Sequence, residues 1–467
     1  MIIKASLFKD AFYFKKGFIM AEIKYQLPRG TQDIYGDDMS LWQQAEQIIR
    51  DQCRLYGYSE IRTPVFEHTE VFKAENDSSD MVNKEMYSFK DNGQRDLTLR
   101  PEGTKGIIRS FVEHKMYGNT DLPVKLFYIE PMFRYDRPQK GRYRQFHQFG
   151  IEAIGLRNAM LDVECIALGY RITKLMGINN VVVLVNSLGD KQSRDNYRKA
   201  LKDYFNPYLQ CLCDDCKRRY QQNPLRILDC KVDKDKDFFI NAPKCKDYLT
   251  DTSKKYFQDV LNGLEQLNIP FKVEDNLVRG LDYYTNTVFE AVPVDDEGQQ
   301  ATLFGGGQYD GLVNSFNGPD YAGVGFGMGI ERLINLSVEQ NGICPVKRTS
   351  DVYIISLGDV NDYSLKIAER LRDNKIVTAL DLSARSLKAQ FKSSDRLQSR
   401  VIVIVGEDEK TNKTAVITRT IAPFLFRFFP FSADGPCNSF RILRTKPEKY
   451  RSQKADETAR GGIPPEF

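Results

Sequence analysis

Residues 133–154 read FRYDRPQKGRYRQFHQFGIEAI, and this stretch decides how the first half of the chain can fold. Two extended runs, 125–135 and 144–154, flank the polar turn 137–141, a pattern that predicts a long β-hairpin. Cationic side chains crowd around that turn: Arg134, Arg137, Lys140, Arg142 and Arg144. Guanidinium groups grip phosphate oxygens with two parallel hydrogen bonds, so the turn is a candidate phosphate-binding site.

The returning strand of this hairpin carries a second signal. Side chains alternate between the two faces of a strand, so Phe146, Gln148, Gly150 and Glu152 share one face. That face offers a ring for stacking, an amide, an open position and a carboxylate. A solvated basic hairpin is the simpler alternative, but it does not require an amide and a carboxylate aligned beside a glycine. We therefore predict that this face binds a ligand.

Residues 321–333, YAGVGFGMGIERL, place glycines at alternate positions of a predicted strand: Gly323, Gly325, Gly327 and Gly329. Glycine weakens a strand, so such a row is expected where a flat group lies against the backbone. Tight packing of the following helix, predicted to start at Glu331, is the alternative. The spacing fits neither the GxGxxG dinucleotide pattern nor a P-loop.

Three shorter segments add polar groups: LRPEGT at 99–104, LVRGLDYYTNTVFE at 277–290 and FGGGQYDGL at 304–312. A carboxylate and a hydroxyl in the first could hold an ammonium group, although each segment alone also fits ordinary turns with an aromatic core. The residues of interest in these segments are Glu102, Gly103, Thr104, Arg279, Tyr283, Tyr284 and Tyr309.

The chain has only three histidines, His68, His114 and His147, and no two of them have the spacing of a helical metal-ligand pair. We expect His147 to be structural because it alternates away from the face of Gln148. Nothing indicates a Ser-His-Asp or Cys-His nucleophile. Arginines, carboxylates and glycine-lined space favour nucleotide binding and phosphate chemistry by positioning and electrostatics.

Other elements follow from apolar periodicity and turn residues. A helix is predicted over 40–56 with Ser40 as its N-cap, then strands at 58–64, 97–99 and 181–185. The charged segment from about 190 to 268 has a helical pattern and contains five of the nine cysteines. Residues 350–417 alternate as β-α-β-α-β, which predicts a small parallel-sheet domain.

Length and composition agree with a globular protein of several domains: 467 residues, of which 41% are hydrophobic and 28% charged. No apolar run approaches the ~18 residues of a membrane-spanning helix, so no membrane partner is expected. We divide the chain into an extension at 1–19, a first part at 20–189, a helical insertion at 190–270, a second part at 271–345, the small domain at 350–417 and an atypical tail at 418–467.

A net charge of +4 is too small to indicate a nucleic-acid partner, so any such contact must come from local patches. One candidate is a stripe with a spacing of four residues along the predicted helix 386–397 and its end: Lys388, Lys392, Arg396 and Arg400. A solvated helix face is the alternative reading of this stripe.

The cysteines allow two interpretations. Cys213 and Cys216 form a Cys-x2-Cys pair, with Cys211, Cys230 and Cys245 nearby, and such a group could bind zinc. The irregular spacing after Cys216 favours reduced thiols, so no metal site is predicted. Reduced thiols and the lack of a secretory apolar region in 1–19 favour the cytoplasm.

Taken together, the segments resemble the class II aminoacyl-tRNA synthetases and, within them, the bacterial histidine–tRNA ligases. Residues 58–67 (YSEIRTPVFE) are similar to motif 1, 133–152 to motif 2 and 323–333 to motif 3, while 279–284 and 305–311 resemble two histidine-specific signatures. The resemblance implies an α+β fold with an antiparallel sheet flanked by helices, the helical insertion, and a C-terminal α/β anticodon-binding domain.

The resemblance also implies roles for particular residues. It assigns Arg134 to the ATP α-phosphate, Arg142 to ATP, and Phe146 with Arg332 to the two faces of the adenine. Arg279 corresponds to the arginine that touches both the substrate carboxylate and the α-phosphate, which makes Arg279 and Arg134 the candidate catalytic residues. The matching histidine-binding residues are Glu102, Gly103, Thr104, Gln148, Glu152, Tyr283, Tyr284 and Tyr309.

The implied substrates and partners are L-histidine, ATP with Mg²⁺ and the tRNA for histidine, bound by a homodimer whose basic stripe contacts tRNA. Two positions depart from the family pattern, since Asp136 replaces a usual Glu and Gln308 a usual Arg. The resemblance stops near Ile417. The alternative function is a catalytically silent histidine sensor like the regulatory subunit of ATP phosphoribosyltransferase, but such a protein should lack the arginines and the anticodon domain.

Overall fold

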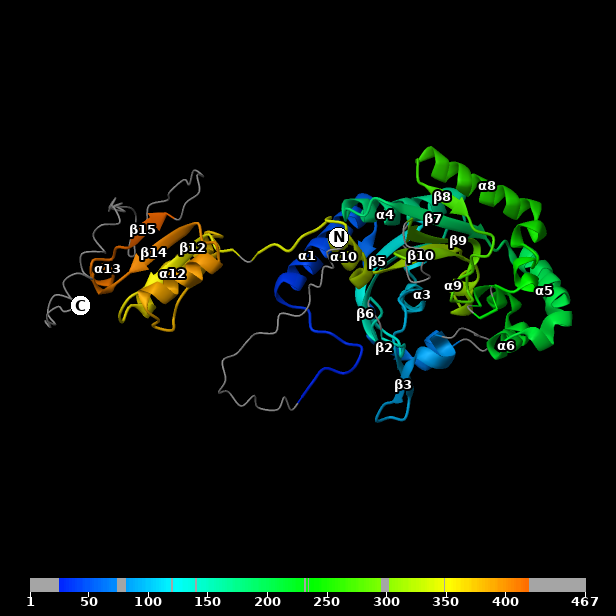
Figure 1. The fold of residues 1–467 in the computed structure, drawn as a ribbon, viewed down its shortest axis with the longest axis horizontal. Helices are drawn as coiled ribbons and strands as arrows, with labels where there is room; N and C mark the ends of the chain where they lie inside the picture. The colour runs from blue at the N-terminus through cyan, green and yellow to red at the C-terminus, as the bar shows by residue number, and fades with distance from the viewer. Residues whose placement is uncertain are drawn as a thin grey trace, which may run out of the picture. The chain divides into compact units, whose positions relative to one another are not determined.

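The computed structural model describes residues 25–419, except for 74–80, 119–120, 139–140, 231, 234, 295–301 and 348. The chain divides into two compact units between Pro345 and Val346 (Figure 1). The predicted extension at 1–19 lies outside the described residues, and so does the predicted tail apart from its first two positions. Within the described residues, no helix is both long and apolar enough to cross a lipid bilayer.

An eight-stranded sheet with the strand order β1-β5-β6-β11-β10-β9-β7-β8 organises the first unit. Adjacent strands in this sheet are antiparallel, except for the parallel pairs β1–β5 and β7–β8 at its two edges. The strands are β1 (Ser59–Glu60), β5 (Val124–Phe133), β6 (Gln145–Ile154), β7 (Val181–Ser187), β8 (Phe271–Val273), β9 (Thr285–Pro293), β10 (Phe304–Tyr309) and β11 (Gly323–Gly329). The predicted α+β class and the predicted hairpin, now β5–β6, are confirmed.

One face of this sheet is buried under helices, and the other face is left for the site. The odd positions of β6, such as Phe149 and Ile151, enter the main hydrophobic core with Val324 and Phe326 of β11. The helices that contribute to this core are α1 (Gly36–Leu55), α4 (Ala159–Leu175), α8 (Asp251–Gln266) and α10 (Ile330–Glu339). Because strand side chains alternate, the even positions of β6 project from the opposite face.

Two helix starts differ from the sequence prediction. Helix α1 begins at Gly36 rather than at Ser40, whose hydroxyl donates to the carbonyl oxygen of Asp37 at 2.7 Å within the first turn. The Ser40 N-cap was therefore wrong, because its hydroxyl bonds back to the preceding turn. Helix α10 begins at Ile330, one residue before the predicted start at Glu331.

The predicted strand over 58–64 is only two residues long. Thr63 leaves the sheet because its backbone N–H donates to Glu130 Oε1 at 3.1 Å and its carbonyl accepts from Arg100 Nη1 at 2.7 Å. Arg100 and Glu130 form a buried ion pair at 2.8 Å. Pro64 then follows, and it has no N–H for a ladder.

A second, three-stranded sheet lies in the same unit, with the order β2-β4-β3. It leads from the predicted strand 97–99 into the helix that starts at Thr104. Its elements and neighbours are β2 (Phe66–His68), α2 (Thr69–Phe72), the π-helix η1 (Met81–Glu85), β3 (Tyr87–Lys90), β4 (Asp96–Leu99), α3 (Thr104–Glu113), the 3-10 helix η2 (Met116–Gly118) and, farther along the chain, α9 (Leu312–Ser315).

The predicted insertion is helical, with its own small core built by residues such as Tyr197, Phe205 and Leu228. Its elements are α5 (Lys191–Phe205), η3 (Asn206–Cys211), α6 (Asp214–Gln222), η4 (Pro224–Asp229), α7 (Asp237–Ile240) and η5 (Cys245–Tyr248). Helix α8, although inside the predicted range 190–270, packs instead on α4 and places Val260 and Leu264 in the main core (Figure 1).

The second unit is the small α/β domain that the alternating pattern predicted. Its sheet has the order β13-β12-β14-β15, with β12 parallel to both β13 and β14. Strand β15 was not predicted; it pairs antiparallel with β14 and extends the sheet two residues past the predicted boundary at 417. The elements are β12 (Val352–Ser356), α11 (Asn361–Asp373), β13 (Thr378–Leu380), α12 (Leu387–Arg396), β14 (Val401–Val405), α13 (Glu407–Thr411) and β15 (Val416–Arg419).

Candidate active site

A cavity of about 490 Å³ lies on the face of the large sheet that the helices leave open. Its walls come from β5, β6, β10, β11, the start of α3, the segment between β8 and β9, η1 and the helical insertion. The cavity brings together predicted residues from three separate sequence segments: Glu102, Thr104, Arg134, Arg142, Gln148, Arg279, Tyr283 and Tyr284. Of the other predicted residues of this unit, Gly103 directly precedes Thr104, Phe146 lies beside Arg134, and Glu152 is bonded to Thr104 and Tyr309. Arg332 lies on α10 and bonds to Thr302 instead.

Glu152 is the centre of a buried polar network beneath this cavity. Its side chain accepts hydrogen bonds from the Thr104 hydroxyl and from the Tyr309 hydroxyl, each at 2.6 Å. Burial of the carboxyl group, which is 1% exposed, raises its pKa to about 8, although both hydroxyls favour the charged form and Glu102 opposes it. The carboxyl group therefore keeps a proton across a pH range in which an exposed Glu would be ionised.

The alternating glycines of β11 make room for the site's own side chains. A Cβ at Gly325 would lie 2.2 Å from Glu152 Oε2, and one at Gly327 would lie 2.2 Å from Gln148 Nε2. At Gly329, by contrast, no atom lies within 4 Å of such a Cβ. The sequence suggested that an external flat group lies against this strand, but the structure shows that protein side chains fill most of that space.

Tyr128 on β5 is a site residue that the sequence reading missed. Its hydroxyl donates to Gln148 Oε1 at 3.0 Å, and its ring fills the space that a Cβ at Gly103 or Gly150 would occupy. Gly150 lies directly opposite Tyr128 in the strand register. In the sequence, Tyr128 resembles any core aromatic residue, and only its pairing with Gly150 could have identified it.

Glu102 is fixed at the N-terminus of α3. Its two oxygens accept from the backbone N–H groups of Thr104, at 2.7 Å, and of Lys105, at 2.9 Å. A carboxylate in this position satisfies helix N–H groups that have no partner within the helix and interacts favourably with the helix dipole. The negative charge of Glu102 is thus held at the cavity wall, where the carboxylate still has lone pairs for a cation.

Arg279 is held by a residue that the sequence reading did not single out. Glu290 of β9 pairs with its guanidinium group, and Gly305 leaves the space for it, since a Cβ there would lie 2.6 Å from Arg279 Nη1. The Nε atom of Arg279 is shielded from solvent and has no hydrogen-bond partner among the described residues. An enclosed donor of this kind is a natural position for an anionic group of a ligand.

The hairpin arginines Arg134 and Arg142 also line the cavity. Arg134 donates from Nε to the carbonyl oxygen of Pro101 at 2.7 Å, and its guanidinium lies 5.3 Å from the centre of the Phe146 ring. Arg142 pairs with Asp136, the position that departs from the family pattern. The wall of the cavity therefore presents both the carboxylate of Glu102 and the guanidinium groups of Arg134 and Arg142.

His147 lies on the helix-covered side of the sheet and makes other contacts. His147 Nδ1 lies 3.0 Å from Glu331 Oε1, and its ring packs edge-on against Trp42. This placement agrees with the predicted structural role of His147. Arg332 on α10 donates to the carbonyl oxygen of Thr302 at 2.5 Å.

Two further predicted features can be placed. Gln308, the second departure from the family pattern, is buried and donates to Asp310 Oδ1 at 3.1 Å.

In the second unit, Lys388, Lys392, Arg396 and Arg400 are all exposed along α12 and just beyond it. The predicted basic stripe is thus present on the surface of that unit.

Comparison with known proteins agrees with this site. The family model described as histidyl-tRNA synthetase matches residues 30–333, and the model described as anticodon binding domain matches 351–421. The chain is 48% identical to the histidine–tRNA ligase of Bacillus subtilis (strain 168) over 388 residues, which cover 82% of this chain and 92% of the relative. It is 46% identical to the histidine–tRNA ligase of Geobacillus thermodenitrificans, covering 91% of this chain and 100% of the relative.

Solved structures give the same result. The apo histidyl-tRNA synthetase of S. aureus superposes with a TM-score of 0.72 at 40% identity, covering 85% of this chain and 95% of that chain. The histidyl-tRNA synthetase of Nostoc sp. PCC 7120 shares the fold, with a TM-score of 0.60 at 20% identity over 85% of this chain and 94% of that chain. From the motifs, the fold and these matches, the chain belongs to the histidyl-tRNA synthetase family.

Proposed function

We propose that the chain is an aminoacyl-tRNA ligase that joins histidine to its tRNA. In the first step, histidine and ATP form histidyl-adenylate and release pyrophosphate; in the second, histidine passes to the 3′ end of the tRNA. The observation that carries the proposal is the buried Glu152–Thr104–Tyr309 network beneath a cavity whose other wall holds Arg279 with an unpartnered Nε.

The network suits an imidazole ring. Imidazole has one nitrogen that donates and one that accepts, and Glu152 with the nearby Tyr284 hydroxyl offers matching groups. Side chains that are buried and polar lose their partners when an analogue cannot hydrogen-bond, so such a site can discriminate by about 10⁴–10⁵. We therefore assign the imidazole of histidine to Glu152 and Tyr284, with Tyr283 and Tyr309 around them.

The ammonium group of histidine would lie beside Glu102 at the cavity wall. Glu102 supplies a fixed negative charge, and Gln148 presents an amide whose orientation is set by Tyr128. Thr104, at the start of α3, links Glu102 to Glu152. This arrangement would leave the substrate carboxylate directed toward Arg279.

Activation needs no general base, because the carboxylate of an amino acid, with a pKa of about 3.3–3.7, is already ionised at neutral pH. The carboxylate oxygen attacks the α-phosphorus in line, the bond to the pyrophosphate leaving group breaks, and negative charge grows on the phosphoryl oxygens. Arg279 and Arg134, which both line the cavity, would stabilise that charge. Arg142 would contact the ATP phosphates, and Phe146 with Arg332 would hold the adenine.

ATP would enter as its magnesium complex. The described residues contain one cluster of three or more side chains that could hold a metal ion. This cluster includes Cys213 and does not include Arg134 or the other hairpin residues. Mg²⁺ prefers oxygen ligands and is commonly held through substrate phosphates. We therefore treat the ion as part of the nucleotide substrate.

The second unit would bind the tRNA, with Lys388, Lys392, Arg396 and Arg400 contacting phosphates. Support comes from its match to the anticodon-binding model and from the exposure of the basic stripe. A sensor like the regulatory subunit of ATP phosphoribosyltransferase is not favoured, because the anticodon domain and the site arginines are both present.

We further propose a cytoplasmic homodimer. The motif 1 segment exposes two large apolar side chains, Val65 at 40% and Phe66 at 51%, which a second copy would cover. None of the eight cysteines in the described part of the chain forms a disulfide, as expected in a reducing compartment.

Aminoacylation of tRNA tests the proposed function. The full chain, incubated with ATP, Mg²⁺ and radiolabelled histidine, should charge bacterial histidine tRNA and no other tRNA. A catalytically silent sensor would bind histidine in the same preparation but transfer none of it. Histidine binding without any charging would therefore contradict the proposal.

A further inference from the structure

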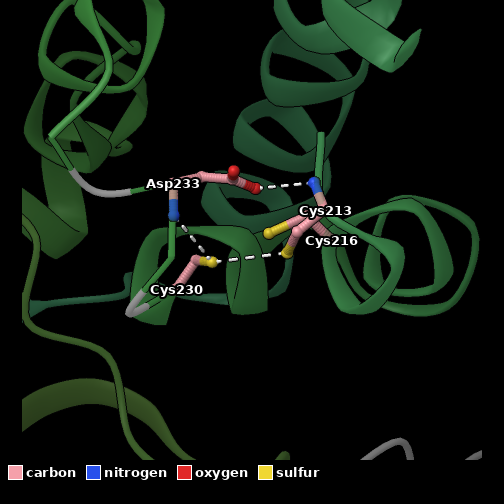
Figure 2. A group of neighbouring side chains, drawn as sticks. All are labelled: Cys213, Cys216, Cys230 and Asp233. Carbon is pink, nitrogen blue, oxygen red and sulfur yellow. Dashed lines mark hydrogen bonds between the residues drawn. The ribbon is translucent and has the colours of Figure 1, made fainter. Parts of the chain in front are cut away.

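A cluster of four metal-ligating side chains lies in the helical insertion. The atoms Cys213 Sγ, Cys216 Sγ, Cys230 Sγ and a carboxylate oxygen of Asp233 all lie within 4.8 Å of one another (Figure 2). We propose that these four residues bind one structural zinc ion. The irregular cysteine spacing after Cys216 favours reduced thiols when only the sequence is considered. The fold supplies Cys230 and Asp233 as the second pair of ligands.

The geometry of the cluster fits a tetrahedral ion. Zinc–thiolate bonds of about 2.3 Å in a tetrahedron place neighbouring sulfurs about 3.8 Å apart. The Sγ atoms of Cys213 and Cys230 are 3.7 Å apart, which is far longer than the ~2.05 Å of a disulfide. Three thiolates with one carboxylate form a closed set of four ligands, which is typical of structural sites that leave no open position for catalysis.

The surroundings of the cluster support the ligands. The backbone N–H group of Asp233 points to Cys230 Sγ at 3.3 Å (Figure 2). The backbone N–H group of Val232 lies 3.4 Å from the same sulfur. The carboxylate of Asp233 accepts from the N–H of Cys213 at 2.9 Å and from Lys236 Nζ at 2.7 Å. Hydrogen bonds of this kind orient metal ligands and moderate their negative charge.

Burial separates the cluster from ordinary surface thiols. Asp233 and Cys216 are both 0% exposed, and Cys230 is 5% exposed. A carboxylate with no exposure beside three thiols costs free energy unless a cation compensates it. Lys236 supplies one positive charge at one oxygen of Asp233. A divalent ion between the sulfurs would supply the remaining positive charge that the carboxylate and the thiolates need.

The ion would also stabilise the wall of the active-site cavity. Cys213 and Cys216 belong to the start of α6, whereas Cys230 follows η4, so a shared ion would join these two elements. From η4, Arg226 donates to the backbone carbonyl oxygen of Arg279 at 2.8 Å. The insertion thus supports the segment that carries Arg279, and Cys213 and Cys230 themselves line the cavity.

Metal analysis of the full chain tests this inference. Protein purified with a reductant, supplied with zinc and freed of loose ions by gel filtration should contain about one zinc per chain. The Cys216→Ser and Cys230→Ser variants should contain at least about tenfold less. Cys211→Ser is the matched control: Cys211 lies two positions before Cys213 but outside the cluster and exposed, so zinc should remain.

A cobalt titration of the unmodified chain avoids the question of whether a variant folds. Tetrahedral cobalt bound by thiolates should give intense visible bands and a thiolate charge-transfer band, which zinc then abolishes. Substoichiometric zinc in the unmodified chain, a different first-row metal in its place, zinc retained in both cluster variants, or no thiolate bands with cobalt would each overturn the inference. These readouts do not depend on catalysis, so failure of the proposed ligase function would leave them unchanged.

Discussion

The hydroxyl of Tyr309 on β10 donates to Glu152 Oε2 on β6 at 2.6 Å, across the glycine strand β11 that lies between these two strands. The contact is possible because Gly323 and Gly325 leave the space that the tyrosine ring and the carboxyl group occupy. Three segments distant in sequence thus converge on one buried carboxyl group. The proposed recognition of histidine depends on this relationship.

Replacing Tyr309 with Phe should weaken the use of histidine without unfolding the protein. The ring still fills its space, but Glu152 loses one of two hydrogen bonds, which costs about 1–3 kcal/mol in a buried site. The KM for histidine in ATP–pyrophosphate exchange should therefore rise by about 5–150-fold. Tyr321→Phe is the control, because Tyr321 packs against Tyr117 away from Glu152, and its KM should not change.

Gly327→Ala and Gly329→Ala form a matched pair on one strand. The new Cβ at position 327 would meet the amide end of Gln148, whereas at position 329 it would meet no atom within 4 Å. We expect the KM for histidine to rise at least about tenfold in the first variant and to stay near wild type in the second. Equal KM values in the two variants would show that Gln148 does not position histidine.

Glu152 should also give the stability a characteristic pH dependence. Its pKa is raised to about 8 in the folded chain, so between its unfolded value and pH 8 the folded state holds a proton that the unfolded state has released. The contribution of Glu152 to the free energy of unfolding is therefore complete at low pH. It decreases as the pH rises toward 8, by at most about 1.4 kcal/mol per pH unit. Buried Asp162, with a pKa raised to about 7, contributes in the same direction.

Urea unfolding of wild type and Glu152→Gln at several pH values would measure this dependence. The Gln variant imitates the protonated carboxyl, so its free energy of unfolding should fall less steeply between pH 5 and 8. An Asp162→Asn variant should lose its own part of the slope and keep that of Glu152. Identical slopes in wild type and Glu152→Gln would contradict a raised pKa at Glu152.

The buried ion pair between Arg100 and Glu130 should be essential for stability. Removing one partner leaves an uncompensated buried charge, which costs about 3–5 kcal/mol, so Arg100→Ala should lower the free energy of unfolding by that amount. The exposed pair of Arg62 and Glu60 is the control, and Arg62→Ala should cost no more than about 1 kcal/mol. Similar losses in the two variants would contradict the assigned role of burial.

Much of this architecture could be predicted from local patterns. The hairpin, the glycine strand and the β-α-β-α-β unit each have a periodicity that one segment displays by itself, and the structure contains all three. Prediction from local patterns failed where side chains distant in sequence determined the backbone conformation. The predicted strand at 58–64 ends early because Arg100 and Glu130 bind the backbone of Thr63.

The candidate site shows the same limit. Polar residues in distinctive segments, such as Arg279 and Glu152, could be identified from sequence, because their neighbours are glycines and aromatic residues. Tyr128 and Glu290 could not, since only strand pairing brings them to Gly150 and Arg279. The cysteine cluster was missed for a related reason, because Asp233 is recognisable as a ligand only once the fold brings it to Cys213.

Histidine-dependent exchange of pyrophosphate into ATP, measured for wild type and Arg279→Ala, tests whether this cavity activates histidine. Arg279 is placed to contact both the substrate carboxylate and the α-phosphate, so losing it should remove charge stabilisation in the transition state. We expect exchange with histidine by the wild type, and a rate at least about 100-fold lower in the variant, which should still bind histidine weakly. No exchange by the wild type, or near-normal exchange by Arg279→Ala, would contradict this proposal.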